Sequence, residues 1–139
     1  MSESTGMTFQ IRMPDKALED QETQKKVVDC YAEEGRQILV TTGPPLKRPA
    51  ETIETFVGRC LQVDLEDVCG TIKDVYMKPH EEGEPYTVLA KVVPSGRQKT
   101  LLGLLTKENI HVDLVPRMML MPNGHLNVVC YDLTPHYDV

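Results

Sequence analysis

The sequence predicts an α+β protein with a mostly antiparallel, barrel-like β-sheet and two main helices. Seven short segments have the composition or the alternation of β-strands, and helical patterns near residues 23–35 and 97–106 interrupt them. Residues 68–105 read in succession as strand, loop, strand, turn and helix. A hairpin followed by a helix is a unit that buries one face, so we expect the other segments to pack on it.

The chain has 139 residues, the length of a single domain, and residues 1–6 are predicted to be a flexible tail. A chain of this size buries roughly two-thirds of its unfolded surface, so its core needs no metal or disulfide. The net charge of −6 argues against nucleic acid as a partner, because phosphates require clustered Lys and Arg. No apolar run approaches the ~18 residues of a membrane span, and the N-terminus lacks a signal peptide's apolar core.

Four cysteines are scattered along the chain without a CxxC pair: Cys30, Cys60, Cys69 and Cys130. A closed zinc site usually has two ligands close in sequence, so we expect no metal and no cofactor. Free, mostly buried thiols in a reducing compartment fit this spacing.

The first third of the chain is predicted to form strand, helix and strand. Residues 7–13 alternate at period two, as a strand does, and Asp15 is placed to cap a short turn. Residues 23–35 carry apolar side chains at helical spacing, with Gly35 as the C-cap. Residues 37–42 are predicted to be the next strand.

The following stretch begins with a proline-rich loop, residues 43–49, which includes Pro44 and Pro45. Residues 51–60 could form a short helix or an extended segment, and because they are rich in β-formers we favour a strand or an irregular segment there. Residues 61–65 alternate and lead into the central unit.

Within the central unit, residues 68–77 and 86–93 are predicted strands joined by an exposed loop. Residues 94–96 form a turn, and four leucines crowd the short helix that follows. Gly103 weakens that helix by roughly 1 kcal/mol relative to alanine.

The last part of the chain is predicted to form a strand pair. Residues 109–115 alternate cleanly, and residues 126–133 form the last strand after an Asn-Gly turn. Residues 118–121, Met-Met-Leu-Met, are an adaptable apolar patch that suits a core or an interface. Residues 134–139 are expected to be a surface arm.

Five motifs occur in an order that resembles the prohead (capsid maturation) proteases of tailed bacteriophages. They are MPDKALE at 13–19, GRQIL at 35–39, VCGTIKDVY at 68–76, VLAKV at 88–92 and the leucine helix at 96–105. Those enzymes are serine proteases whose fold is related to the herpesvirus assemblins. The resemblance spans nearly the whole chain and implies an assemblin-like β fold.

The catalytic residues that the resemblance implies are missing from their expected positions. Pro44 stands where the family has its histidine, and Val115 and Pro116 precede Arg117 where the family has its serine nucleophile. A serine protease needs a nucleophile and a base within hydrogen-bond reach. The resemblance therefore implies the fold of the protease without its catalysis.

We accordingly expect no enzyme but a phage structural or assembly protein, in the host cytoplasm or in the virion, that binds capsid protein or other copies of itself. The candidate protein-contact residues are Pro44, Pro45, Arg117, Met118, Met119 and Met121.

Two alternatives remain open at this point. One is a small phage protein that binds and blocks a host factor, since acidic charge suits a basic partner. The other is an active protease with relocated chemistry, for example His111 or His125 acting with Ser95 or Thr42. His111 and Asp113, on one face of a strand, are a candidate acid-base pair, although such polar pairs are usual on half-solvated strands.

Overall fold

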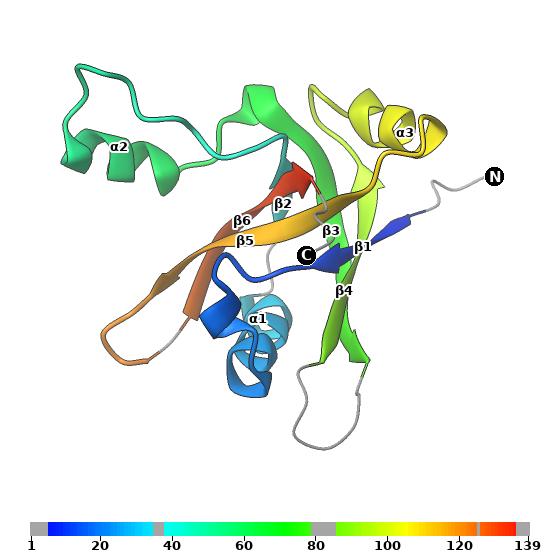
Figure 1. The fold of residues 1–139 in the computed structure, drawn as a ribbon, viewed down its shortest axis with the longest axis horizontal. Coiled ribbons are helices and arrows are strands. Elements are labelled where there is room, and N and C mark those ends of the chain that lie inside the picture. The colour runs from blue at the N-terminus through cyan, green and yellow to red at the C-terminus, as the bar shows by residue number, and fades with distance from the viewer. Residues whose placement is uncertain (1–5, 35–37, 79–85, 125, 136–139) are drawn as a thin grey trace.

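A computed structural model describes residues 6–34, 38–78, 86–124 and 126–135 of the chain. Within these ranges, six strands form a closed barrel and three α-helices lie outside it (Figure 1). The elements are β1 (Met7–Ile11), a 3-10 turn (Lys16–Leu18), α1 (Gln21–Glu34), β2 (Leu39–Thr41), α2 (Ile53–Cys60), a 3-10 turn (Leu65–Asp67), β3 (Val68–Lys78), β4 (Thr87–Pro94), α3 (Thr100–Lys107), β5 (Val112–Leu120) and β6 (Leu126–Pro135).

The barrel has the strand order β1-β4-β3-β2-β6-β5 and closes between β5 and β1. Its β1–β4, β4–β3, β3–β2 and β6–β5 contacts are antiparallel. The β2–β6 and β1–β5 contacts are parallel, and the latter contains the single pair Ile11 and Leu114. The predicted α+β class with a barrel-like sheet is therefore confirmed, and the sheet is mixed.

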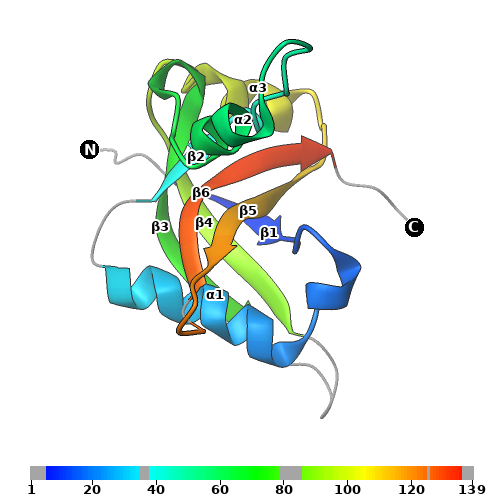
Figure 2. The ribbon, with the colours of Figure 1, turned by 90° about the vertical axis from the view of Figure 1, so that its left-hand side faces the viewer.

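The barrel interior is the hydrophobic core. Residues from all six strands are buried there, among them Ile11, Val40, Ile72, Val92 and Leu114. Helix α1 lies across one end of the barrel, and α3 lies near the other end (Figure 2). Both predicted main helices thus cover the barrel, as expected of helices with one apolar face.

Helix α3 approaches the sheet closely because β3 carries a glycine at the contact. A Cβ on Gly70 would lie 2.6 Å from Val92 Cγ1 and 3.2 Å from Leu102 Cδ1. Leu102 is the buried side chain of α3. The missing side chain at residue 70 therefore lets the leucine helix pack on the barrel.

The structure corrects the expectation for residues 51–60: Ile53–Cys60 form helix α2, the alternative that was not favoured. The Thr52 side chain caps this helix by accepting a hydrogen bond from Thr55 N at 3.2 Å. An ion pair between Glu51 and Arg59, described below, spans its two ends. Local capping and a charged pair outweigh the β-propensity of these residues.

Two further expectations are also corrected. Residues 61–65 lead into a 3-10 turn, and β5 begins only at Val112, so Ile110 is exposed and does not share a core face with Leu114. Asp113 is buried because its carboxylate pairs with Arg12 Nε at 3.3 Å. Strand β5 then continues through the methionine patch to Leu120.

Asp15 caps the first 3-10 turn as predicted, accepting from Ala17 N at 3.0 Å. Several expectations fall wholly or partly outside the described residues: the tail at 1–6, the Gly35 cap, the loop after β3, His125 and the C-terminal segment at 134–139.

Candidate functional site

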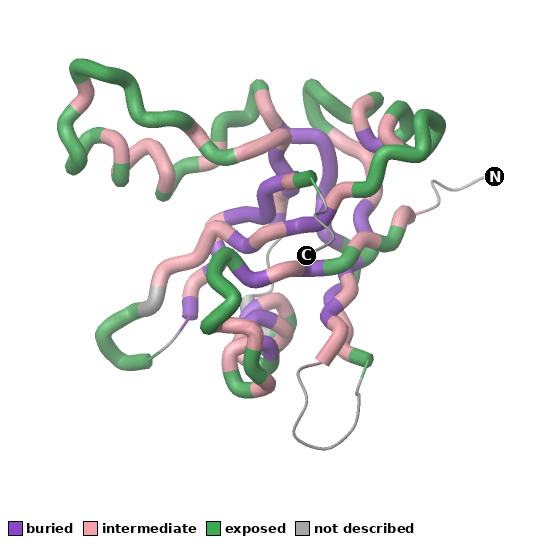
Figure 3. Tube along the Cα trace, viewed as in Figure 1, coloured by how far each residue is buried: buried purple, intermediate pink, exposed green. Residues whose placement is uncertain are grey.

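Residues 42–67 leave the barrel between β2 and β3 and form a projection that we call the arm. Figure 1 shows it extending sideways from the barrel, with α2 as its returning segment. None of the residues of α2 is buried, in contrast to the barrel strands (Figure 3). The arm is therefore an exposed element and contributes little to the core.

One ion pair fixes the internal shape of the arm. Arg59 donates from Nε to Glu51 Oε2 at 2.7 Å and from Nη2 to Glu51 Oε1 at 2.6 Å. Arg59 also donates to the Leu46 carbonyl at 2.8 Å, and Arg48 N donates to Glu51 Oε1 at 3.1 Å. Hydrogen bonds from Arg59 lower the pKa of Glu51 to about 2. The outgoing loop is thus fastened to α2 by charge-assisted bonds.

Arg117 of β5 attaches the arm to the barrel. Its Nε and Nη2 donate to the two carboxylate oxygens of Asp132 on β6, at 3.0 and 2.6 Å. Its Nη1 donates to the carbonyls of Cys60 and Gln62, both at 3.1 Å. One guanidinium therefore joins two barrel strands to the end of α2.

The surroundings of Arg117 keep it charged. Burial, the largest single effect, disfavours its cation, but the hydrogen bonds to Asp132 and the nearby negative charges together outweigh it, so the pKa of Arg117 is raised. The Thr41 hydroxyl also bonds Asp132 Oδ1, at 2.5 Å. Burial is the main cause, and the charge of Asp132 the second, that raises the pKa of Cys130 to about 12, so this thiol is neutral. With Asp132 already accepting from Arg117 and Thr41, the cluster is suited to anchoring the arm.

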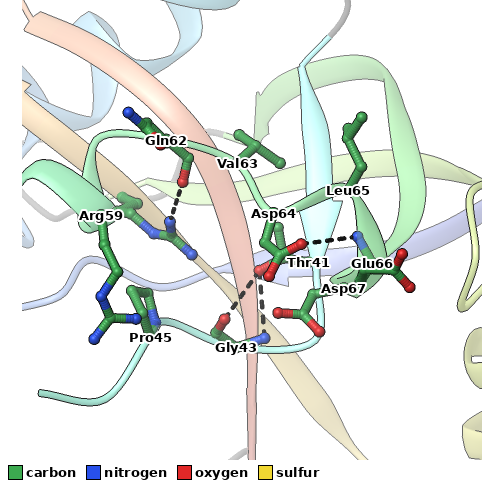
Figure 4. A pocket seen from close by; sticks show the side chains of 11 residues that line it. Thr41, Gly43, Pro45, Arg59, Gln62, Val63, Asp64, Leu65, Glu66 and Asp67 are labelled. Atoms are coloured by element: carbon green, nitrogen blue, oxygen red, sulfur yellow. Dashed lines mark hydrogen bonds between the residues drawn. The ribbon is translucent and has the colours of Figure 1, made fainter. Parts of the chain in front are cut away.

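A cavity of about 590 Å³ lies where the arm meets the barrel (Figure 4). Its lining comes from the end of β2, from the start of the arm, from α2 and the residues after it, and from β5: Thr41, Gly43, Pro45, Arg59, Gln62, Val63, Asp64, Leu65, Glu66, Asp67 and Arg117. The structure thus brings Pro45 of the proline loop and Arg117 of β5 to the same cavity.

An exposed apolar stripe runs along α2 and its C-cap residue. Ile53, Val57 and Leu61 follow one another at four-residue spacing and are 68%, 46% and 43% exposed. Leu46 and Leu65, elsewhere on the arm, are also exposed. Side chains four apart lie on one face of a helix, so the three form a continuous stripe. The sequence prediction missed this stripe because it favoured a strand or an irregular segment over a short helix at these residues.

The predicted contact residues fall into two groups. Pro44 is exposed on the arm, Pro45 lines the cavity, and Arg117 is the anchor described above. Met118 packs against the core, Met119 is half-buried, and Met121 is exposed beside the turn between β5 and β6. These three methionines do not line the cavity, so the structure separates them from the proline loop.

The residues considered for relocated catalysis do not converge within the described parts of the chain. The hydroxyls of Ser95 and Thr71 lie 2.6 Å apart and share a hydrogen bond. His111 and Asp113 line a second hollow, of about 370 Å³, which Ser95 and Thr42 do not reach. Asp113 there pairs with Arg12. His125 lies outside the described residues.

The chain matches no protein-family model, no curated protein and no solved structure. In the described ranges, none of the helices is long and apolar enough to cross a membrane. The four cysteines, all described, form no disulfide with one another, and three of them are buried. In the same ranges, His, Cys, Asp and Glu form no cluster suited to hold a metal ion.

Proposed function

We propose that this protein is a non-catalytic binding protein of phage structure or assembly, and that the arm is its contact element. The observation that carries the proposal is the exposed stripe of Ile53, Val57 and Leu61 on a helix without buried residues. Burying one such side chain contributes about 1.5–3 kcal/mol, so the stripe favours a protein surface that covers it.

The arm presents this stripe in a fixed position. Arg59 and Glu51 hold the outgoing loop on α2, and Arg117 holds the end of α2 on the barrel. Ordering a segment on binding costs free energy, and a segment already ordered avoids that cost. The arm therefore supports protein binding better than a loop of the same composition would.

The assignment to phage assembly rests on the order of the sequence motifs. Proline at residue 44 and the absence of a hydroxyl at residues 115–116 support binding without hydrolysis. The partners would be capsid protein or other copies of this chain, met in the host cytoplasm or in the virion. We assign no cofactor, nucleic acid or membrane to the site.

A second candidate is a protein that binds and blocks a host factor. The net charge of −6 favours it, because an acidic protein attracts a basic partner over distances beyond contact. Both candidates use the arm, and they differ in whether the protein is found in purified particles.

The test places a photo-crosslinking amino acid at Val57 and, as a matched control, at Lys107, which is exposed on α3 and outside the arm. Phage particles made with each variant are purified, irradiated and analysed by mass spectrometry. We expect many copies per particle and protein crosslinks from residue 57 alone. Equal crosslinking from both positions would remove the arm from the proposal, and crosslinks to a host protein outside particles would favour the second candidate.

A further inference from the structure

We propose that the stripe on α2 pairs with the same stripe on a second copy of this chain, the two helices running antiparallel about a two-fold axis. This inference rests on the proposed function of the arm and names its partner. It follows from the symmetry of the stripe and from the opposite charges that flank the two ends of α2.

The stripe is symmetric about its middle residue. Val57 lies four residues from Ile53 and four from Leu61. In an antiparallel pair with its axis at Val57, each Ile53 meets the Leu61 of the second copy, and the two Val57 side chains meet at the centre. A two-fold interface must be self-complementary in this way. Helix α2 is about 12 Å long, so the three contacts span its whole length.

The residues that flank the two ends of α2 carry opposite charges. Lys47 and Arg48 lie at the N-terminal end of α2, where Arg48 N bonds Glu51 just before the Thr52 cap. Acidic residues follow its C-terminal end, namely Asp64, Glu66 and Asp67. Antiparallel pairing places the basic end of each copy against the acidic end of the other, and the helix dipoles favour the same arrangement.

Charges within one chain offset only part of this pattern. Glu54, in the first turn of α2, reduces the positive charge at the basic end. Glu66 pairs with Arg97 at 3.2 Å, but both side chains are exposed, so that pair is weak. Glu51 at the basic end and Arg59 at the acidic end neutralise each other in their ion pair. The remaining charges keep opposite signs at the two ends. A parallel pair would instead set like charges together, which disfavours that orientation.

The position of the arm leaves the stripe accessible to a second copy. Figure 1 shows α2 extending away from the barrel. The Cys60 carbonyl accepts a hydrogen bond from Arg117, and the Arg59 side chain donates to Glu51. The stripe residues are exposed. An interface with so few apolar side chains predicts a reversible dimer whose population depends on concentration.

The first experiment measures dimerisation of the full chain by sedimentation equilibrium over a wide concentration range. We expect a monomer–dimer equilibrium, and we expect Val57→Asp to weaken it at least tenfold, because it places two carboxylates at the axis. The matched control is Leu104→Asp, which alters an exposed leucine on α3 and should leave the dissociation constant unchanged. Equal effects of the two substitutions would overturn the proposal.

The second experiment tests orientation by reversing charges. The variant Lys47→Glu/Arg48→Glu makes both ends acidic, and Glu66→Lys/Asp67→Lys makes both ends basic, so each should dimerise less than the wild type. An equimolar mixture should recover heterodimers, because every contact then joins opposite charges. Recovery also shows that both variants are folded, whereas a mixture no stronger than its components would overturn antiparallel pairing.

The outcomes separate this inference from the proposed function. A wild-type chain that stays monomeric at all concentrations, while residue 57 crosslinks to another protein, would overturn self-pairing and leave the arm as a binding element. A monomeric chain without crosslinks from residue 57 would overturn both.

Discussion

Arg117 on β5 and Asp132 on β6 are diagonal neighbours across the antiparallel pair, joined by two hydrogen bonds of 3.0 and 2.6 Å. The same guanidinium donates to the carbonyls of Cys60 and Gln62 at the end of α2. The pair therefore links the contact between β5 and β6 to the position of the arm. Loss of Arg117 should disturb both.

We predict that Arg117→Met destabilises the protein by about 3–5 kcal/mol, because it leaves the buried carboxylate of Asp132 without its charged partner. It should also free the end of α2, so limited proteolysis should cut the arm faster. Urea denaturation monitored by circular dichroism measures the first effect.

The double variant Arg117→Met/Asp132→Asn should be less destabilised than the sum of the two single changes, since it removes both charges together. Arg97→Ala breaks the exposed pair with Glu66 and serves as the control, with a loss below about 1 kcal/mol. If the losses in unfolding free energy of the two single variants simply added in the double variant, Arg117 and Asp132 would not be coupled.

The sequence predicted the elements whose apolar residues recur at regular spacing. It did not favour helix α2, which local contacts stabilise. Six strands and helices α1 and α3 follow hydrophobic patterns that are visible in a single chain. Helix α2 contains Thr55, Phe56 and Val57, which favour strands, and Gly58, which weakens helices. The Thr52 cap and the Glu51–Arg59 pair decide the conformation, and neither is a periodic signal.

Strand pairing and the partners of Arg117 could not be read from the sequence for a related reason. Alternation predicts a strand but does not say which strand lies beside it, so the parallel contact between β2 and β6 had no signal. Arg117 was singled out by its position in a resemblance, and its partner Asp132 lies on a different strand. The structure therefore assigns it an anchoring role that spacing could not reveal.

We predict that Gly70→Ala destabilises the fold by about 1–3 kcal/mol, because the new methyl group would collide with Val92 and press on Leu102. Gly103→Ala is the matched control on α3. A Cβ there meets no atom within 4 Å, so the change should stabilise the helix by about 0.5–1 kcal/mol. Thermal unfolding of the two variants should shift in opposite directions, and a shared direction would contradict the close approach of α3.

The arm should loosen in acid. The hydrogen bonds from Arg59 lower the pKa of Glu51 from 4.5 to about 2, so the folded arm favours the ionised carboxylate. This contribution is fully present above pH 4.5 and is lost as the pH falls from 4.5 towards 2. Hydrogen exchange of the α2 amides, corrected for intrinsic rates, should therefore show falling protection in that window. Glu51→Gln should lower protection at neutral pH and remove this pH dependence.

Thiol reactivity should differ between the arm and the barrel. Cys60, at the end of α2, is partly exposed, while Cys30, Cys69 and Cys130 are buried. Burial raises the pKa of Cys69 to about 11, which further suppresses its thiolate. We expect one fast-reacting thiol in the native protein and four after denaturation without reductant. The variant Cys60→Ser should remove the fast phase, and fewer than four thiols in the denatured wild type would indicate a disulfide.

The final prediction is that the purified protein does not hydrolyse peptide bonds. Pro44 has no proton to exchange, Val115 and Pro116 carry no nucleophilic oxygen, and the Ser95 hydroxyl shares a hydrogen bond with Thr71. Nucleophile and base act as a unit, so their loss lowers turnover by several orders of magnitude. Incubation with capsid, scaffold and unfolded substrates, followed by mass spectrometry, should show no cleavage. Any cleavage that disappears in Ser95→Ala, Thr42→Ala or His111→Ala, while the variant stays folded, would restore the protease hypothesis.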